Sequence, residues 1–321
     1  MHPRRQFVAL AALVALVGSA SAGEWPDKPV KIIYPYAAGS TGDVTARLIA
    51  HRLSEKLGQP FIVENRVGAN GVIGTEAVAR SAPDGYMLLW AITPQIAISP
   101  VMTKVPYDPV RDFVPISAVS TNRFALIVNA KVPAKTVAEF VAYVRAQPHG
   151  FIYAEGGAGS VSHLAMVLLL NRAGVQGTNV SYKGTGLALT DVIAGHLPAM
   201  FALFGDALSQ TDGGVIRILA VSSEQRSALA PYVPSIAESG FPGFNATSWW
   251  GLMGPAGMPK PIVDRIAAEV GQAIKDPKIV EQLTKFGVDP VGNNPQEFSA
   301  MISADIKLWA EAVRMAGLKA K

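Results

Sequence analysis

Apolar residues follow two alternating patterns along the chain. Short apolar runs such as residues 30–34 are typical of buried strands, and longer segments such as residues 43–57 repeat apolar positions with helical spacing. The apolar positions on one face of that longer segment are Val44, Leu48, Ile49, Leu53 and Leu57. Gly58 is a natural helix stop. A strand followed by such a helix is the basic unit of an α/β fold.

The same alternation recurs along the rest of the chain. Further strands are predicted at residues 61–63, 86–91, 151–154, 180–182, 199–203 and 216–221. Further helices are predicted at residues 71–80, 161–172 and 187–194, and three amphipathic helices follow near the C-terminus, the last one after Pro295. Because strands alternate with helices, the sequence predicts an α/β fold with mainly parallel sheets.

Two extended segments are expected to join two lobes. The chain has 321 residues, which is long for one small domain. Residues 113–129 are β-rich, and residues 244–253 contain Trp249 and Trp250, which we interpret as core or hinge packing rather than a ligand platform. Lobe 1 is predicted to comprise residues 23–122 plus 249–321, and lobe 2 residues 123–248. A cleft between lobes is the default ligand site of such an arrangement.

The first 22 residues have the composition of an export signal. Arg4 and Arg5 give a positive start, and residues 7–17 form an apolar run too short to span a bilayer with ease. Ala20-Ser21-Ala22 supplies the small residues that signal peptidase needs, so we predict cleavage after Ala22. The paired arginines leave both the general and the twin-arginine export routes open.

Charge and cysteine content narrow the possible functions. Loss of residues 1–22 removes two arginines and no acid, which lowers the formal net charge from +4 by two. A near-neutral chain without a basic cluster gives no case for binding nucleic acid. The chain has no cysteine, which excludes disulfides, thiolate nucleophiles and a lipid anchor attached to cysteine. No metal site or cofactor is predicted, since the five histidines form no His-Glu-x-x-His pattern.

A Gly-rich loop joins the first predicted strand to the first helix. Ser40 is placed to cap that helix, with Asp43 three residues later as in a capping box. The N–H groups at a helix start carry a partial positive charge that suits a carboxylate. The predicted ligand-binding residues of this loop are Gly39, Ser40, Thr41 and Asp43.

Two loops in the predicted second lobe have the same design. Ser160 is predicted to cap the helix that follows residues 156–159, and Thr185 to cap the helix that follows Lys183. His163, inside the first of these helix starts, is expected to pack or cap rather than bind. The predicted ligand-binding residues of these loops are Gly157, Gly159, Ser160, Ser162, Thr185 and Gly186.

Six stretches in order along the chain carry a family resemblance. They are Trp25-Pro26-Asp27-Lys28-Pro29-Val30, Val63-Glu64-Asn65-Arg66, Ala82-Pro83-Asp84-Gly85-Tyr86, Gly159-Ser160 with His163-Leu164-Ala165, Tyr182-Lys183-Gly184, and Thr247-Ser248-Trp249 through Gly254-Pro255-Ala256-Gly257. Together they resemble the Bug family, the receptor components of tripartite tricarboxylate transporters.

The resemblance implies a two-lobed periplasmic binding protein fold, type II-like, with two interlobe crossings and a mainly parallel, helix-flanked sheet in each lobe. It also implies a periplasmic receptor whose loops 39–43 and 157–162 hold a ligand carboxylate, with water bridges on the first-lobe side. Two departures bear on ligand identity. Pro198 and Ala202 stand where family members often carry acids, with Asp206 nearby, and Ser40 stands where members commonly have glycine.

The predicted function is capture of a small organic carboxylate for the membrane permease subunits of a tripartite tricarboxylate-type transporter. The ligand classes left open are di- or tricarboxylates, amino acids and aromatic acids, and the receptor is expected to be a monomer. A ligand sensor for a membrane signalling partner would use the same binding chemistry and stays open.

A serine hydrolase is the competing enzyme class. Residues 38–42 resemble a nucleophile elbow around Ser40, with His163 or His196 as the base. Such an elbow normally follows several strands, whereas this one follows the first, so we do not expect an enzyme.

Overall fold

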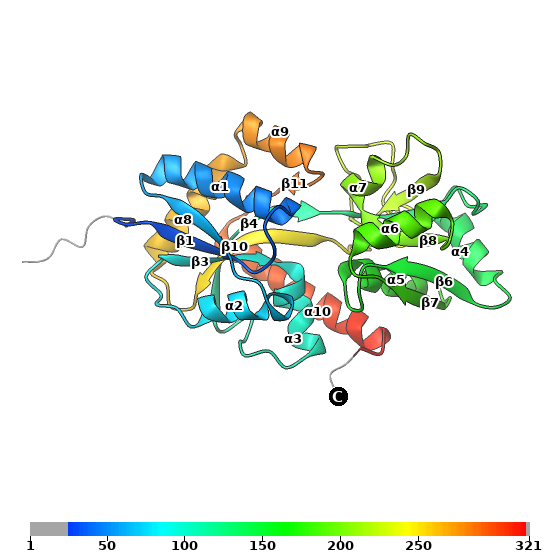
Figure 1. Ribbon diagram of the computed structural model, residues 1–321, viewed down its shortest axis with the longest axis horizontal. Helices are drawn as coiled ribbons and strands as arrows, with labels where there is room; N and C mark the ends of the chain where they lie inside the picture. The colour runs from blue at the N-terminus through cyan, green and yellow to red at the C-terminus, as the bar shows by residue number, and fades with distance from the viewer. Residues whose placement is uncertain (1–24, 319–321) are drawn as a thin grey trace, which may run out of the picture.

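The computed structural model describes residues 25–318, which form two helix-flanked sheets in two lobes of an elongated molecule (Figure 1). The first sheet has the strand order β11-β4-β10-β3-β1-β2, and the second has the order β7-β6-β8-β5-β9. The strands of the first sheet are β1 (Val30–Tyr34), β2 (Phe61–Asn65), β3 (Met87–Ile92), β4 (Phe113–Asn122), β10 (Ser248–Pro255) and β11 (Asp289–Pro290). Those of the second are β5 (Phe124–Asn129), β6 (Phe151–Glu155), β7 (Gly177–Ser181), β8 (Ala199–Leu203) and β9 (Ile216–Val221).

Helices cover both sheets. In the first lobe they are α1 (Thr41–Leu57), α2 (Val72–Ala79), α3 (Ser99–Met102), α8 (Lys260–Ala273), α9 (Pro277–Lys285) and α10 (Pro295–Met315), with short 3-10 and π turns at Ala69–Gly71 and Pro94–Ile98. In the second lobe they are α4 (Val137–Arg145), α5 (Val161–Arg172), α6 (Thr185–Ala194) and α7 (Phe204–Leu208).

The predicted α/β class and two-lobed fold are confirmed, but both sheets are mixed rather than mainly parallel. β1 pairs in parallel with β2 and β3, and β6 with β7 and β8, because helices connect them. The strands that link the lobes, β4, β5 and β10, pair antiparallel with their neighbours. β4 and β5 carry the chain from the first lobe to the second, and β10 carries it back, without a crossover helix. The alternation of predicted strands and helices in the sequence does not reveal these connections.

One predicted strand lies elsewhere. The strand expected at residues 180–182 is β7, which spans Gly177–Ser181. β7 is an edge strand whose residues are mostly exposed. Its apolar pattern is therefore weak, and the predicted bounds were shifted toward the C-terminus.

The first sheet is buried on both faces. Side chains alternate along a strand, so Ile32 packs with α1 and α8 on one face, while Ile33 packs with α2 and α10 on the other. Both isoleucines are completely buried. This explains why β1 reads as a continuous apolar run rather than an alternating one.

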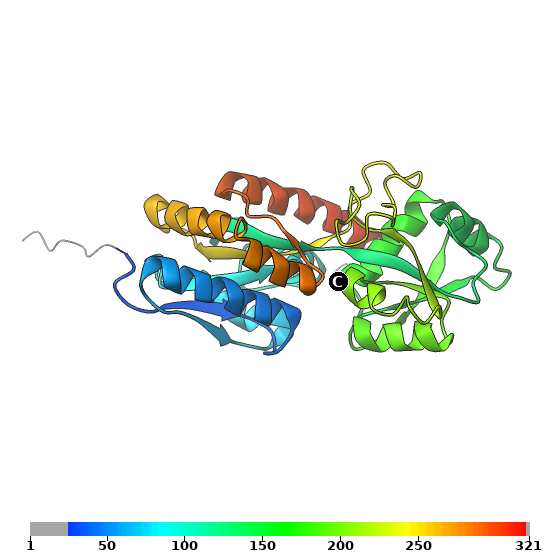
Figure 2. The ribbon, with the colours of Figure 1, turned by 90° about the horizontal axis from the view of Figure 1, so that it is seen from above.

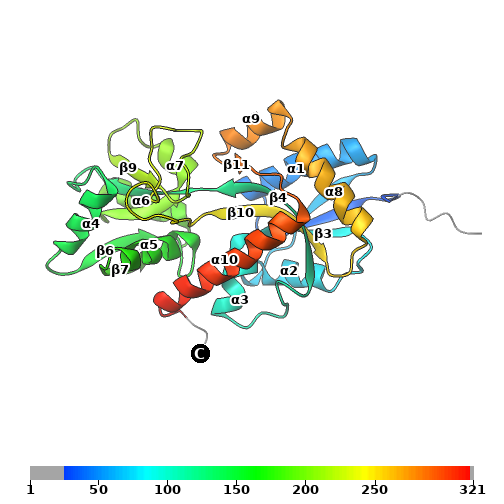
Figure 3. The ribbon, with the colours of Figure 1, turned by 180° about the vertical axis from the view of Figure 1, so that it is seen from behind.

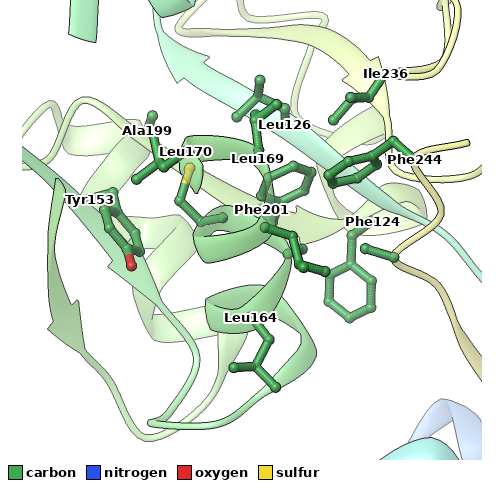
Figure 4. Close-up of a cluster of buried hydrophobic side chains, with 14 of the residues drawn as sticks. Phe124, Leu126, Tyr153, Leu164, Leu169, Leu170, Ala199, Phe201, Ile236 and Phe244 are labelled. Atoms are coloured by element: carbon green, nitrogen blue, oxygen red, sulfur yellow. The ribbon is translucent and has the colours of Figure 1, made fainter. Parts of the chain in front are cut away.

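The second lobe has its own apolar core around β5, β8 and α5 (Figure 4). Phe201 of β8 and Phe244 stack with ring centroids 6.4 Å apart, and Leu164 and Leu169 of α5 are fully buried beside them. Residues near 244 thus join the second-lobe core just before the chain crosses back in β10.

Helix α10 connects the lobes in addition to the two crossings. Its first half buries Phe298 and Ile302 against the first sheet, whereas Trp309 and Val313 in its second half belong to the second-lobe core. Figure 3 shows α10 in orange-red in front of the first sheet, running toward α5 of the second lobe. The predicted lobe boundaries stay a prediction. The second half of α10, which was assigned to lobe 1, packs in the core of the second lobe.

The two neighbouring tryptophans of β10 have different surroundings. Trp249 is completely buried, and its Nε1–H donates to Asp305 of α10 at 2.7 Å, which agrees with the predicted hinge packing. Burial raises the pKa of Asp305 to about 6, although the hydrogen bond from Trp249 opposes the shift.

No helix among residues 25–318 is long and apolar enough to cross a membrane. The predicted signal peptide and its cleavage point lie outside the described residues.

Replacing Trp309 by alanine is expected to lower the free energy of unfolding by about 3–5 kcal/mol, because it empties a fully buried site between α10 and the second lobe. Urea denaturation followed by circular dichroism measures the change. The control is Leu187→Ala, at a leucine that is 58% exposed, with an expected change within about 0.5 kcal/mol. Equal effects of the two substitutions would contradict the placement of α10 in both cores.

Candidate functional site

A cavity of about 400 Å³ lies between the lobes, where the two crossings meet the start of α1. Its first-lobe wall is formed by Tyr34, residues 39–42 and residues 286–288, and its second-lobe wall by residues 203–206. Asn122, Arg123 and Trp250 of the crossings line it as well. A larger recess of about 670 Å³ lies between α4 and β9 and contains none of the predicted loop residues.

The start of α1 is fixed by its cap. Ser40 has extended backbone angles, and its Oγ accepts the N–H of Asp43 at 3.3 Å, as predicted. The same Oγ lies 3.0 Å from the hydroxyl of Tyr34, whose pKa is raised by burial, so that the phenol stays protonated. Figure 1 shows that α1 lies roughly along the long axis of the molecule, with its N-terminal end facing the second lobe.

Asp43 folds the loop rather than facing the cavity. Its carboxylate accepts the N–H of Gly39 at 3.0 Å, Nδ2 of Asn65 at 2.8 Å and two bonds from Arg47 at 3.0 and 3.1 Å. The second half of the predicted capping box is therefore absent, because the short Asp side chain turns to Gly39 instead of the Ser40 N–H. Burial alone would raise the pKa of Asp43, but the hydrogen bonds from Arg47, Gly39 and Asn65 outweigh it and lower the pKa.

Three donors at the start of α1 remain available to a guest. Within residues 25–318, no protein acceptor bonds the N–H groups of Thr41 and Gly42 or the indole Nε1–H of Trp250. The three donors lie close together because Gly42 has no side chain. A Cβ at Gly42 would lie 2.5 Å from the Tyr34 hydroxyl and 3.0 Å from Trp250 Nε1. Trp250, which we expected only to pack, thus lines the cavity.

The loop that begins α5 is held mainly by the protein's own acceptors. Ser160 caps the helix, as predicted, by accepting the His163 N–H at 3.2 Å. Glu155 accepts the Gly157 N–H, and His163 Nδ1 accepts the Gly159 N–H at 3.1 Å. Burial lowers the pKa of His163, which keeps the imidazole neutral and able to accept. Ligand contact by Gly157, Gly159 and Ser160 stays a prediction.

Two further predicted site residues have structural surroundings of their own. The Ser162 hydroxyl is buried and donates to the carbonyl of Phe201. Thr185 is not a helix cap, which corrects the prediction: Gly184 occupies the cap position with φ 114°, and Thr185 is the first helical residue. Gly186 follows in open space, since a Cβ there would meet no atom within 4 Å.

The cavity therefore gathers only part of the predicted set. Gly39, Ser40 and Thr41 line it, whereas the predicted second-lobe residues do not. Sequence reasoning missed Tyr34, Gly42 and Trp250. The alternation of side chains in β10 carried a signal for Trp250, because two adjacent strand residues face opposite ways.

Among residues 25–318, no contact of Ser40 supports the hydrolase alternative. The Oγ of Ser40 bonds to Tyr34, Asp43 and the Ala37 carbonyl, and across the described residues no histidine bonds to it. The ring of His163 bonds to Gly159, and that of His196 to Asp191.

Comparison with known proteins places the chain in a family. The family model described as the receptor of the tripartite tricarboxylate transporter family matches residues 45–318. The chain is 35% identical to the protein BugT of Bordetella pertussis over 317 residues, which is 98% of this chain and 96% of BugT. That family consists of solute-binding receptors, not enzymes.

Solved structures agree with this placement. The R. palustris protein Rpa4515 with adipate superposes with a TM-score of 0.77 at 32% identity, covering 91% of this chain and 98% of the other. The periplasmic binding protein BugD superposes with a TM-score of 0.74 at 32% identity, covering 92% of this chain and all of BugD.

Replacing Asp43 by asparagine is expected to lower the free energy of unfolding at pH 7 by about 2 kcal/mol, because charge-assisted hydrogen bonds to Gly39 and Arg47 are lost. The folded pKa lies below the ordinary 3.8, so the stabilisation is present above that pH and disappears as the pH falls through the folded value. Urea denaturation at pH 7 and pH 3 measures both differences. A deficit of the variant that is no smaller at pH 3 would exclude the ionised carboxylate as its cause.

Proposed function

The chain belongs to the receptor family of tripartite tricarboxylate transporters, and from that premise we propose that it captures a small organic carboxylate between its lobes and delivers it to membrane permease subunits. The similar protein Rpa4515 has been solved with adipate, which supports a carboxylate ligand.

The observation that carries the proposal is the group of unused donors at the start of α1. The N–H groups of Thr41 and Gly42 carry the partial positive charge of a helix N-terminus, and Trp250 adds a third donor. A carboxylate has two oxygens and four lone-pair sites, so one carboxylate end can accept all three. The guanidinium of Arg47 is already engaged by Asp43 and Asn65.

Closure of the lobes completes the site in this proposal. Helix α6 lies in the second lobe, on the side of the molecule that also carries α1 (Figure 2), and α5 packs against α10. Rotation about the two crossings would bring Ser160, Thr185 and Gly186 toward a guest bound at α1. The ligand drives this closure only to the extent that it binds the closed form more tightly.

We also propose the finer points of location and assembly. Residues 1–22 act as an export signal that is cleaved after Ala22, and the receptor is free in the periplasm, since the chain has no cysteine for a lipid anchor. BugD, a periplasmic binding protein of similar structure, supports that compartment. The receptor acts as a monomer that presents its closed form to the permease.

A thermal-shift screen with a panel of organic acids is expected to yield at least one acid that raises the melting temperature. At 100 times its dissociation constant a ligand stabilises the folded state by about 2.7 kcal/mol. Neutral analogues such as the corresponding amides serve as the control and should leave the melting temperature unchanged. An unchanged melting temperature with every acid would contradict carboxylate capture.

Gly42→Ala is expected to weaken binding of the acid found in that screen at least tenfold, because the new methyl group must displace Tyr34 or Trp250. Isothermal titration calorimetry measures the affinity, and circular dichroism verifies the fold. Gly213→Ala is the matched control, since a Cβ at that glycine meets no atom closer than 3.9 Å. Equal affinities of both variants and the parent would remove the start of α1 from the site.

A further inference from the structure

Two side chains that carry a formal charge, Arg123 and Asp206, line the interlobe cavity besides the donors of α1. Arg123 sits between β4 and β5, and Asp206 lies in α7 on the second lobe. They differ in how far other residues of the protein already pair with them.

Arg123 is already paired. Its guanidinium forms an ion pair with Asp289 of β11, and its Nε donates to the Ser223 Oγ at 2.7 Å. The charge of Arg123 is therefore compensated inside the protein. A second ligand carboxylate near Arg123 would compete with a carboxylate that is already in place.

Asp206 has no such compensation. Within residues 25–318, its carboxylate forms no hydrogen bond or ion pair with another residue. The side chain is open to the cavity, yet the surrounding protein removes part of its hydration, and this desolvation raises its pKa. A ligand group that donates a hydrogen bond and carries a positive charge stabilises the ionised Asp206 carboxylate in place of the lost hydration.

The position of Asp206 is fixed by a close contact between the lobes. The preceding residue, Gly205, meets Gly287 of the first lobe backbone to backbone, so that a Cβ at Gly205 would lie 3.1 Å from the Gly287 Cα. Asp206 therefore belongs to the cavity wall in the present arrangement of the lobes. No large movement of α7 is required to present Asp206 to a guest.

The wall around these polar groups is apolar. Leu203, Phe204, Phe286 and Val288 line the same cavity of about 400 Å³. A short chain of methylene groups suits such a lining. The cavity thus offers donors for a carboxylate at α1, an apolar wall, and an unpaired carboxylate at α7.

Resting on the proposed function, we propose that Asp206 selects ligands that carry an ammonium group at the end opposite their carboxylate, in preference to dicarboxylates of the same length. An ammonium donates to Asp206 and balances its charge, whereas a second carboxylate meets a like charge. In this respect the receptor differs from the similar protein Rpa4515, which was solved with adipate.

The test compares acids that differ only at the far end. The pairs are succinate with 4-aminobutanoate, glutarate with 5-aminopentanoate, and adipate with 6-aminohexanoate. Calorimetry on the mature full-length protein is expected to show at least tenfold tighter binding of the ammonium member in the pair that fits. Asp206→Asn is expected to remove that preference by weakening the ammonium member and strengthening the dicarboxylate. Asp212→Asn, at an exposed acid outside the cavity lining, is the matched control and should preserve the preference.

Each other outcome decides one of the two proposals. Tighter binding of the dicarboxylates, or an unchanged preference in Asp206→Asn, overturns the role of Asp206 and leaves carboxylate capture standing. If no member of any pair binds but another acid raises the melting temperature, the proposed ligand class is wrong and capture again stands. If no acid binds in either assay, the proposed function itself fails.

Discussion

The carboxylate of Asp43 is the interaction on which the site depends. It lies buried at the start of α1 and receives hydrogen bonds from Gly39, Asn65 and Arg47, which belong to three different parts of the first lobe. By holding Gly39 it sets the turn before Ser40, and Ser40 in turn caps the helix. The N–H groups of Thr41 and Gly42 have no acceptor among residues 25–318, and both residues line the cavity. Electrostatic recognition here relies on the loop being folded before the ligand arrives.

The arrangement of the lobes follows from strands that pass between them. β4 continues into β5 at Arg123, and β10 returns the chain with Trp249 facing the α10 side and Trp250 facing the cavity. The same crossing strands thus form the hinge and the floor of the site. A guest that bonds to Trp250 contacts the hinge directly, which provides a physical route from binding to closure. Helix α10 links the lobes as well, because its two halves are buried in different cores.

Local features were predictable from the sequence, and non-local ones were not. The caps at Ser40 and Ser160 follow from residues within one turn of each helix. The cap expected at Thr185 failed because Gly184 adopts the cap position, a choice between two neighbours that the residue types leave open. Arg123, Asp206 and Trp250 reach the cavity only through the packing of two lobes. No sequence period records that packing, although the alternation in β10 separates the two tryptophans.

The claim that free donors at the start of α1 hold the guest can be measured by nitrogen–proton correlation spectroscopy. The assigned backbone signals of Thr41 and Gly42 and the indole signal of Trp250 are followed during titration with the acid that binds. The account predicts that these three signals shift together and saturate at the calorimetric dissociation constant. Shifts confined to the recess between α4 and β9, with these three signals unmoved, would contradict it.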